Sequence, residues 1–325
     1  MVSEAKLGIV AIGRNEGERL KACLRSLPPG IPVVYVDSGS TDGSAAFARS
    51  MGAEVIDLDL SRPFTAARAR NKGFEQLVES EPQLELVQFI DGDCELEQGW
   101  LEGAAAHIRQ DTALAAVCGR RAEKFPQNSF YNAMCDAEWN TPIGQTDACG
   151  GDALYRVAAF RAVGGFDPAL IAHEEPDLCS RARAAGYNIE RLDLPMTRHD
   201  ANITRFNQFW RRNVRAGYGY AQATVKHWKS LNNRGHAFCR RALMWALIFP
   251  SLCLILSLLV WPWGLLSWLI FPLQIGRRAT LGGLGWRRAA FELLHKFAEF
   301  DGMLKWLADI VRRRRRDAVQ YKTAS

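Results

Sequence analysis

The sequence predicts an α/β fold in which a parallel sheet carries helices on both faces, followed by a helical C-terminal region. Three observations support this prediction. Short apolar runs alternate with helical patterns through the first part of the chain, which is typical of parallel sheets. Polar clusters directly follow several of the apolar runs. After residue 230 the composition changes to one long apolar stretch between arginine pairs.

The expected elements follow from apolar periodicity and from the residues that stop helices. Pro28, Pro29 and Gly30 end the first helix, Gly52 follows the second, and Ser40 or Thr41 is the expected cap of the second. The expected strands are 7–12, 33–36, 54–58, 86–90, 115–118 and 189–194. The expected helices are 16–26, 41–50, 65–78, 100–109 and 178–185.

The composition is that of a globular protein with a basic tail. Of the 325 residues, 48% are apolar and 23% are charged, so a real core is expected. The net charge of +6 owes much to the run Arg312 to Arg316. Such a run suits anionic lipid or nucleic acid. Aromatic side chains do not interleave with the basic ones, so binding of nucleic acid is not expected.

The eight cysteines and the N-terminus favour a reducing compartment. No two cysteines have the close spacing of a zinc site, and buried reduced thiols are expected in place of disulfides. Residues 1–6 lack the basic and apolar segments of a secretory signal. The main domain is therefore expected in the cytoplasm.

Residues 242–275 form an apolar stretch with Arg240 and Arg241 before it and Arg277 and Arg278 after it. One spanning helix needs roughly 20 apolar residues, so the stretch is long for one span and short for two. Arginines at both ends favour cytoplasmic ends. We expect a re-entrant or shallow hairpin that turns at 261–264; a buried core hairpin is the alternative.

An amphipathic helix is expected over 286–311. Its apolar positions are Trp286, Ala290, Leu293, Leu294, Phe297, Phe300, Leu304, Leu307 and Val311, and its opposite face carries Arg287, Arg288, Lys296 and Lys305. This pattern predicts a helix at the surface of an anionic membrane. Packing on the catalytic domain is the alternative, and both can hold.

The most informative polar cluster is Asp91-Gly92-Asp93, which follows an apolar run. Two carboxylates at a strand end can hold Mg²⁺ or Mn²⁺, with a diphosphate completing the shell. A surface turn is the alternative, because Asp-Gly is common in turns. In open α/β sheets ligands bind beyond the carboxyl ends of strands, so the clusters after the other strands are expected beside it.

Four further clusters are candidates for a site. Asp37 precedes a glycine-rich turn, where it could accept hydrogen bonds from a base or ribose or simply order the turn. Arg68 and Arg70 begin a helix and could face a diphosphate. Gly150 and Gly151 would let the backbone approach a substrate. Crowded carboxylates within 174–177 are either a general base with its neighbours or a complement to the helix dipole.

Taken in order, these segments resemble family 2 glycosyltransferases of the GT-A fold. The resemblance covers roughly residues 6 to 225. It rests on Arg14-Asn15-Glu16, the run Val36 to Gly43, Ala69-Arg70-Asn71-Lys72-Gly73, Asp91-Gly92-Asp93, Gly150-Gly151 with Tyr155-Arg156, Gly164-Gly165-Phe166-Asp167 and Glu174-Glu175-Pro176-Asp177-Leu178.

The resemblance implies a metal site and a catalytic base. Asp91 and Asp93 correspond to the metal-binding Asp-x-Asp motif, with His199 completing the shell around Mn²⁺ or Mg²⁺. Glu175 stands where the family usually has the aspartate that deprotonates the acceptor hydroxyl. Because this is a departure, Asp177 stays a second candidate for the base.

The resemblance also implies a donor site. Asp37 and Arg70 would contact the nucleobase, and Arg211 could contact the diphosphate. Arg211 lies in Gln208 to Arg212, which looks like a degenerate Gln-x-x-Arg-Trp motif of processive synthases, so processive synthesis is not implied. The full set of expected donor residues is Asn15, Glu16, Asp37, Ser38, Arg70, Asp91, Gly150, Gly151 and Arg211.

The implied function is inverting transfer of a sugar from a nucleotide sugar to a hydroxyl acceptor. A UDP-sugar is the expected donor, with GDP- and dTDP-sugars as alternatives. A catalytic domain over 1–228 and a membrane-associating region over 229–325 would place the reaction at the cytoplasmic face of the inner membrane, near a lipid-linked acceptor. The rival functions are a sugar nucleotidyltransferase, which the loop Gly13 to Glu16 disfavours, and an inactive scaffold, which would have lost the carboxylates.

Overall fold

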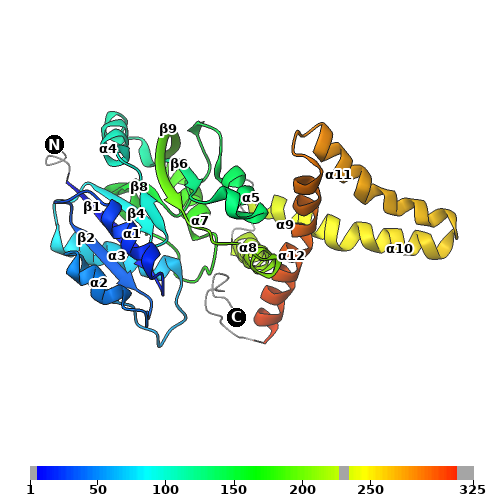
Figure 1. The fold of residues 1–325 in the computed structure, drawn as a ribbon, viewed down its shortest axis with the longest axis horizontal. Coiled ribbons are helices and arrows are strands. Elements are labelled where there is room, and N and C mark those ends of the chain that lie inside the picture. The colour runs from blue at the N-terminus through cyan, green and yellow to red at the C-terminus, as the bar shows by residue number, and fades with distance from the viewer. Residues whose placement is uncertain (1–5, 227–233, 313–325) are drawn as a thin grey trace. The chain divides into compact units, whose positions relative to one another are not determined.

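A computed structural model describes residues 6–226 and 234–312, and the chain divides into two compact units, one ending at Thr204 and one beginning at Arg205 (Figure 1). The predicted domain boundary at 228/229 and residues 313–316 of the arginine run lie outside the described residues. Helix 206–226, which we assigned to the catalytic domain, groups with the C-terminal helices.

The first unit is built on one sheet of nine strands in the order β3-β2-β1-β4-β8-β6-β9-β5, with β7 pairing β9. Strands β1 to β4 are parallel, β6 is parallel to β9, and β5, β7 and β8 run antiparallel to their neighbours. The strands are β1 Leu7–Gly13, β2 Val33–Asp37, β3 Glu54–Asp57, β4 Leu86–Asp91, β5 Cys94–Leu96, β6 Leu114–Glu123, β7 Gly144–Gln145, β8 Ala153–Arg156 and β9 Asn188–His199.

The predicted parallel sheet is present in β1 to β4, but the antiparallel strands β5, β7 and β8 were not predicted. Apolar periodicity reports where a strand lies and which face it buries, whereas its direction depends on the connection that precedes it. Two strands are also longer than predicted: β6 runs five residues past Cys118, and β9 reaches His199. Both extensions are polar at their ends, and they carry site residues.

Helices cover the sheet at the predicted places, although two of them begin elsewhere. Helix α2 begins at Ser44 after Gly43, with no side-chain cap, so Ser40 and Thr41 do not cap it. Helix α7 begins at Glu174, four residues before the predicted start. The helices of this unit are α1 Glu18–Ser26, α2 Ser44–Ser50, α3 Ala66–Ser80, α4 Trp100–Gln110, η1 Pro126–Asn128, α5 Phe130–Trp139, α6 Val157–Ala162 and α7 Glu174–Ala184.

The register of the central strands gathers the polar clusters at one edge of the sheet. Strand β1 lies between β2 and β4, Gly13 pairs with Asp37, and Ile12 pairs with Asp91. The strands are buried and apolar, as strands covered on both faces are. The loops after β1, β2 and β4 therefore leave the sheet side by side, as predicted.

The second unit is entirely helical over the residues that the structure describes. Helix α8 packs tightly on α12: Gly217 faces the backbone of Glu299, and Gly302 faces the backbone of Val214, with no room for a Cβ at either glycine. Glycine is required there because the two backbones approach so closely. The helices are α8 Phe206–Lys226, α9 Arg234–Leu243, η2 Met244–Ile248, α10 Phe249–Leu259, η3 Trp263–Leu269, α11 Ile270–Thr280 and α12 Trp286–Val311.

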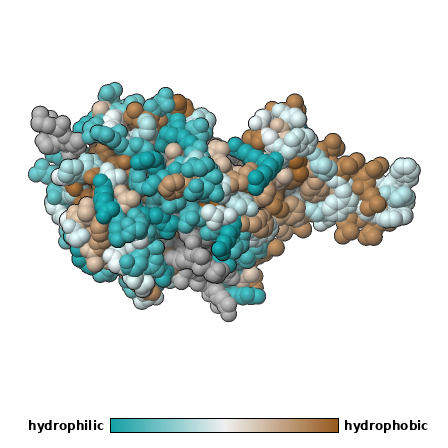
Figure 2. Space-filling view, viewed as in Figure 1, coloured by the Kyte–Doolittle hydropathy of each residue, from teal (hydrophilic) through white to brown (hydrophobic). Residues whose placement is uncertain are grey.

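The apolar stretch forms an exposed hairpin, which we define as residues 249–280. Helix α10 packs against η3, where Trp268 Nε1 donates to Ser257 Oγ at 3.2 Å. Leu258, Leu259 and Trp263 at its turn are 75%, 75% and 72% exposed. The hydropathy colouring shows brown surface along α10 and α11 (Figure 2). The alternative of a buried core hairpin was wrong, because a core hairpin would cover these side chains.

Helix α12 has the predicted bounds and exposes apolar positions, but one basic residue predicted on its polar face is buried. Lys296, expected on the solvated face, is buried and donates to Glu299 at 2.8 Å. Leu304, Leu307 and Val311, expected on the apolar face, are exposed, as a helix at a membrane surface requires. The small residues that face α8 decide this orientation, because only they permit the close crossing.

Candidate active site

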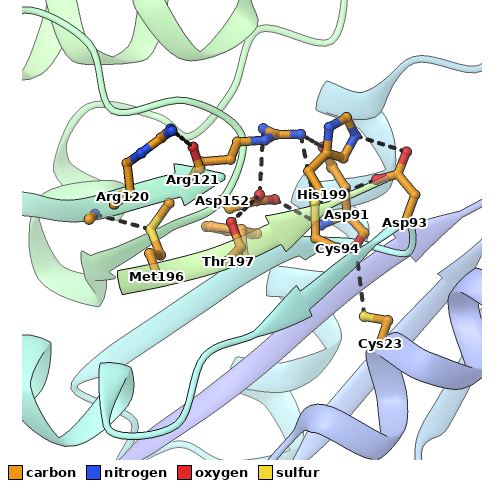
Figure 3. A network of polar contacts seen from close by, with 12 residues as sticks. Cys23, Asp91, Asp93, Cys94, Arg120, Arg121, Asp152, Met196, Thr197 and His199 are labelled. Carbon is orange, nitrogen blue, oxygen red and sulfur yellow. Dashed lines mark hydrogen bonds and ion pairs between the residues drawn. The ribbon is translucent and has the colours of Figure 1, made fainter. Parts of the chain in front are cut away.

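The candidate metal ligands Asp93 and His199 lie in contact. Asp93 follows β4, and His199 ends β9, where it is opposite Cys94 of β5. His199 Nε2 lies 3.2 Å from Asp93 Oδ2 (Figure 3). Burial, together with the charge of Arg121, lowers the pKa of His199 to about 3. The imidazole is therefore neutral at pH 7 and has a lone pair to offer a metal ion.

Asp91 is held between two arginines. Its Oδ1 lies 2.7 Å from Arg70 Nη2, and its Oδ2 lies 3.7 Å from Arg121 Nη2. Burial alone raises the pKa of a carboxyl, but these two cations outweigh it and hold the pKa of Asp91 below its ordinary value. Asp91 is therefore a fixed anion beside Asp93.

A buried polar layer lies beneath the pair, and sequence reasoning gave its members no role. Asp152 is buried, accepts from the Asp91 backbone N–H at 3.0 Å and from Thr197 Oγ1 at 3.1 Å, and lies 3.5 Å from Arg121 Nη1. Arg121 also lies under Trp139, 5.0 Å from the ring centroid. The glycine pair before Asp152 could have indicated from the sequence that Asp152 belongs to the site. No sequence pattern indicated Arg121, which lies in the unpredicted extension of β6.

The residues present fit a hard divalent cation. Ligand atoms of Asp93, Cys94 and His199 lie within 4.8 Å of one another, and Asp91 belongs to an adjoining group with Cys94 and Asp152. Two carboxylates and a neutral imidazole suit Mn²⁺ or Mg²⁺, with further positions left for phosphate oxygens. Cys94 is protonated, because burial raises the pKa of its thiol.

The loops after β1 and β2 are joined by hydrogen bonds. Asn15 Oδ1 accepts from the Thr41 N–H at 2.7 Å, and the Asn15 N–H donates to Ser40 Oγ at 2.9 Å. Asn15 has a φ of 53°, a left-handed conformation that asparagine tolerates. Asp42 adds a further hydrogen bond between the two loops by accepting from the Gly17 N–H at 2.8 Å. This wall of the site is therefore pre-formed.

Asp37 is buried and orders its own turn. Its Oδ2 accepts from the N–H groups of Gly39 and Ser40 at 3.0 and 2.6 Å, and its Oδ1 accepts from the Tyr35 hydroxyl at 3.1 Å. Ser38 is buried beside it. This geometry agrees with both interpretations of Asp37, as a residue that orders the turn and as an acceptor for a base or ribose, because a nucleobase pocket also needs an ordered turn.

The glycine pair and Glu174 enclose Arg70. A Cβ on Gly151 would lie 2.5 Å from Arg70 Nη2, and Gly150 has a φ of 81° that favours glycine. Arg70 Nη1 donates to Glu174 Oε1 at 2.7 Å. Arg70 is thus buried between Asp91 and Glu174. The sequence indicated Glu174 only as one of the crowded carboxylates within 174–177, and its ion pair with Arg70 was not predicted.

The two candidate bases have different surroundings. Asp177 is buried and lies 2.8 Å from Arg181 Nη2, one helical turn away. Glu175 is buried, and its Oε1 accepts from the Cys149 N–H at 2.5 Å and from the Cys179 thiol at 2.8 Å. Neutral donors hold Glu175, whereas a cation holds Asp177. The two carboxylates therefore differ in their partners, and only Asp177 has its charge balanced by a neighbouring cation among the contacts of the described residues.

The remaining expected donor residues are Glu16 and Arg211. Glu16 begins the loop to α1 and lies 2.9 Å from Arg19. Arg211 is exposed on α8, in the second compact unit.

The sheet places paired aspartates at the end of the central strand β4 and a histidine at the end of β9, and the fold is that of GT-A-like glycosyltransferases. Residues 9–164 match the model of glycosyl transferase family 2. This part of the chain is therefore a family 2 glycosyltransferase domain.

Curated relatives and solved structures agree with this assignment. The succinoglycan biosynthesis protein ExoA of Rhizobium meliloti is 25% identical over 82% of this chain and 81% of its own length. Glycosyltransferase AglE of Haloferax volcanii is 25% identical over 64% of this chain and 70% of its own. The mannosyltransferase PcManGT of Pyrobaculum calidifontis, solved with GDP-Man and Mn²⁺, shares the fold with a TM-score of 0.65 at 18% identity, over 94% of this chain and 87% of that one.

Proposed function

We propose that this protein is a divalent-cation-dependent, inverting glycosyltransferase that moves a sugar from a nucleotide-sugar donor to a hydroxyl acceptor. The contact between Asp93 and His199, with the anion of Asp91 beside it, carries the proposal. Asp91, Asp93 and His199 would hold Mn²⁺ or Mg²⁺. When bound, such an ion stabilises the negative charge that develops on a departing diphosphate.

Other residues of the chain would bind the donor and support the metal site. The joined loops around Asn15 and Asp37 would receive the nucleoside, and the backbone at Gly150 and Gly151 would approach the sugar diphosphate. Arg70 and Arg121 fix Asp91 and add positive charge beneath the phosphate site. Holding these groups in place before the reaction is the main source of electrostatic stabilisation.

Glu175 would accept the proton of the acceptor hydroxyl. The hydroxyl oxygen then forms a bond to the anomeric carbon while the bond from that carbon to the diphosphate oxygen breaks. Attack from the face opposite the leaving group inverts the configuration. The hydrogen bonds from the Cys149 N–H and the Cys179 thiol hold one carboxylate oxygen, which fixes the orientation of the base.

We further propose that the second unit associates with the cytoplasmic face of the membrane, where a sugar or lipid-linked sugar would be the acceptor. One helix in the described part of the chain, Gly235–Leu259, is long and apolar enough to span a membrane. The exposed leucines and tryptophans of the hairpin and the exposed apolar positions of α12 support membrane contact.

The nucleotide of the donor is best identified by binding. Thermal shifts with UDP, GDP, dTDP and CMP, each with Mn²⁺ or with chelator, would be compared between the wild type and Asp93→Asn. A ligand that binds the folded state raises its melting temperature. We expect one nucleotide to stabilise the wild type only with Mn²⁺ and to lose this effect in Asp93→Asn. UDP is the expected nucleotide, and GDP is the first alternative because PcManGT was solved with GDP-Man.

The same measurement tests the rival functions. No stabilisation by any nucleotide with Mn²⁺ would favour an inactive scaffold. Stabilisation by nucleoside triphosphates above diphosphates would favour a nucleotidyltransferase. Release of free nucleoside diphosphate from the matching nucleotide sugar, absent in Glu175→Gln, would then confirm transfer chemistry.

A further inference from the structure

A second cluster of metal-binding side chains surrounds Glu175. Cys149 Sγ lies 3.5 Å from Cys179 Sγ, and Cys179 Sγ lies 2.8 Å from Glu175 Oε1. All three ligand atoms lie within 4.8 Å of one another, and all three residues are buried. Glu175 and Cys179 are one turn apart on α7, so they share a face, and Cys149 comes from the loop before Gly150.

We propose that Cys149, Cys179 and Glu175 form an inhibitory site for a thiophilic divalent cation such as Zn²⁺ or Cd²⁺. Two sulfurs and one carboxylate oxygen are ligands that such ions prefer, whereas Mg²⁺ and Mn²⁺ prefer oxygen. The cluster is therefore distinct in chemistry from the site at Asp91 and Asp93.

The spacing of the sulfurs suits a metal. A zinc–sulfur bond is about 2.3 Å, so two thiolates on a tetrahedral ion lie about 3.8 Å apart. The observed 3.5 Å needs a change of only a few tenths of an ångström. A small apolar cavity of about 10 Å³ borders Cys179 and Tyr155, which leaves room for this adjustment.

The neighbouring groups suit bound thiolates. The Tyr155 hydroxyl lies 3.0 Å from Cys149 Sγ and can donate to a thiolate. In the metal-free state both thiols are protonated, since burial raises the pKa of each. Binding therefore displaces two protons to solvent, forms two metal–sulfur bonds and one metal–oxygen bond, and changes no oxidation state.

Occupancy would block the reaction because the ion takes Glu175 Oε1. This consequence rests on the proposed role of Glu175 as the base. The metal site itself rests only on the positions of the three side chains. Binding and inhibition are therefore measured separately, so that one can fail without the other.

The binding test is a titration of the full-length protein with Cd²⁺ in excess Mg²⁺, followed by the near-ultraviolet absorption of cadmium–thiolate bonds. We expect saturation at one Cd²⁺ per chain, with affinity reduced at least tenfold in Cys149→Ala and in Cys179→Ala. Cys135→Ala is the matched control, because Cys135 is a buried thiol outside the metal-binding clusters of the described residues, and it should bind as the wild type does. Melting curves establish that each variant is folded.

Absence of the band in the wild type, or its persistence in both Cys149→Ala and Cys179→Ala, would overturn the site. The inhibition test uses Zn²⁺ in excess Mn²⁺. We expect Zn²⁺ to slow transfer by the wild type and by Cys135→Ala, and to leave the residual transfer by Cys179→Ala unchanged. Equal inhibition of all three would place Zn²⁺ at the Asp91 and Asp93 site and overturn the inhibitory role. If no transfer is seen in any variant, the proposed function fails while the optical titration still decides the metal site.

Discussion

The guanidinium of Arg70 lies 2.7 Å from Asp91 Oδ1 and is buried beneath it. The same guanidinium reaches Glu174 at 2.7 Å, so one cation links α3 to the strand end that carries the Asp-Gly-Asp motif and to the first turn of α7. We predicted a contact of Arg70 with the nucleobase. Its position instead favours a role in fixing Asp91, and the two roles are separable by experiment.

We predict that Arg70→Met destabilises the fold by about 3–5 kcal/mol. Removal of the cation leaves Asp91 and Glu174 as neighbouring anions without their partner. The free energy of unfolding in urea measures the loss. The double variant Arg70→Met with Glu174→Gln should recover part of it, because one uncompensated charge is removed; equal stability of the single and double variants would show that Glu174 is not the cause.

The effect of Mn²⁺ on nucleotide binding should depend on Asp93. We predict that Asp93→Asn abolishes the Mn²⁺-dependent part of nucleotide stabilisation and lowers the rate of transfer, because a neutral amide is a poor ligand for a hard cation. Glu102→Gln, an exposed change on α4, is the matched control and should behave as the wild type does. A full metal response in Asp93→Asn would remove Asp93 from the ligand set.

The depressed pKa of His199 predicts a dependence of stability on pH. The folded state keeps His199 neutral down to about pH 3, whereas an unfolded histidine binds a proton near pH 6.5. The contribution of His199 is therefore complete above pH 6.5 and falls as the pH drops below it. With chelator present, the loss between pH 7.5 and 5.5 should be about 1.4 kcal/mol smaller in His199→Asn than in the wild type. Parallel pH curves would mean that His199 is protonated in the fold.

Substitutions of the two candidate bases should have different effects on catalysis and stability. Glu175→Gln should lower kcat by roughly 100- to 10,000-fold with little loss of stability, because it removes a proton acceptor but keeps the shape of the side chain. Asp177→Asn should lower the free energy of unfolding by about 1.5–3 kcal/mol, since it removes the charge of buried Asp177 that pairs with the partly exposed Arg181, and should retain kcat per folded molecule. The reverse pattern would make Asp177 the base.

The exposed hairpin gives a prediction for localisation. The pair of changes Leu258→Asp and Leu259→Asp should move the full-length protein from the membrane fraction to the supernatant, because charged side chains are costly in the bilayer. Leu281→Asp, at a still more exposed site just past α11, is a control for added surface charge and should have a smaller effect. Unchanged sedimentation of the first variant would argue against membrane contact through this turn.

The sequence alone determined the alternation of strands and helices, the places of Asp37, Asp91 and Asp93 at strand ends, and the bounds of helix 286–311. These features are local, because apolar periodicity, helix stops and strand ends each depend on a few consecutive residues. The side-by-side arrangement of the loops after β1, β2 and β4 also followed, because strands of this kind deliver their carboxyl ends to one edge.

The tertiary structure decided which polar groups meet. Arg70 and Glu174 are 104 residues apart, Asp91 and Asp152 are 61 apart, and Cys149 and Cys179 are 30 apart. Such contacts depend on strand order and on the direction of β8, which periodicity does not report. The burial of Lys296 on α12 has the same origin, since the close packing of α8 on α12 at Gly217 and Gly302 decides which side of α12 is covered. Burial then sets the charge state of each group, because the pKa of a side chain depends on the neighbours that only the fold supplies.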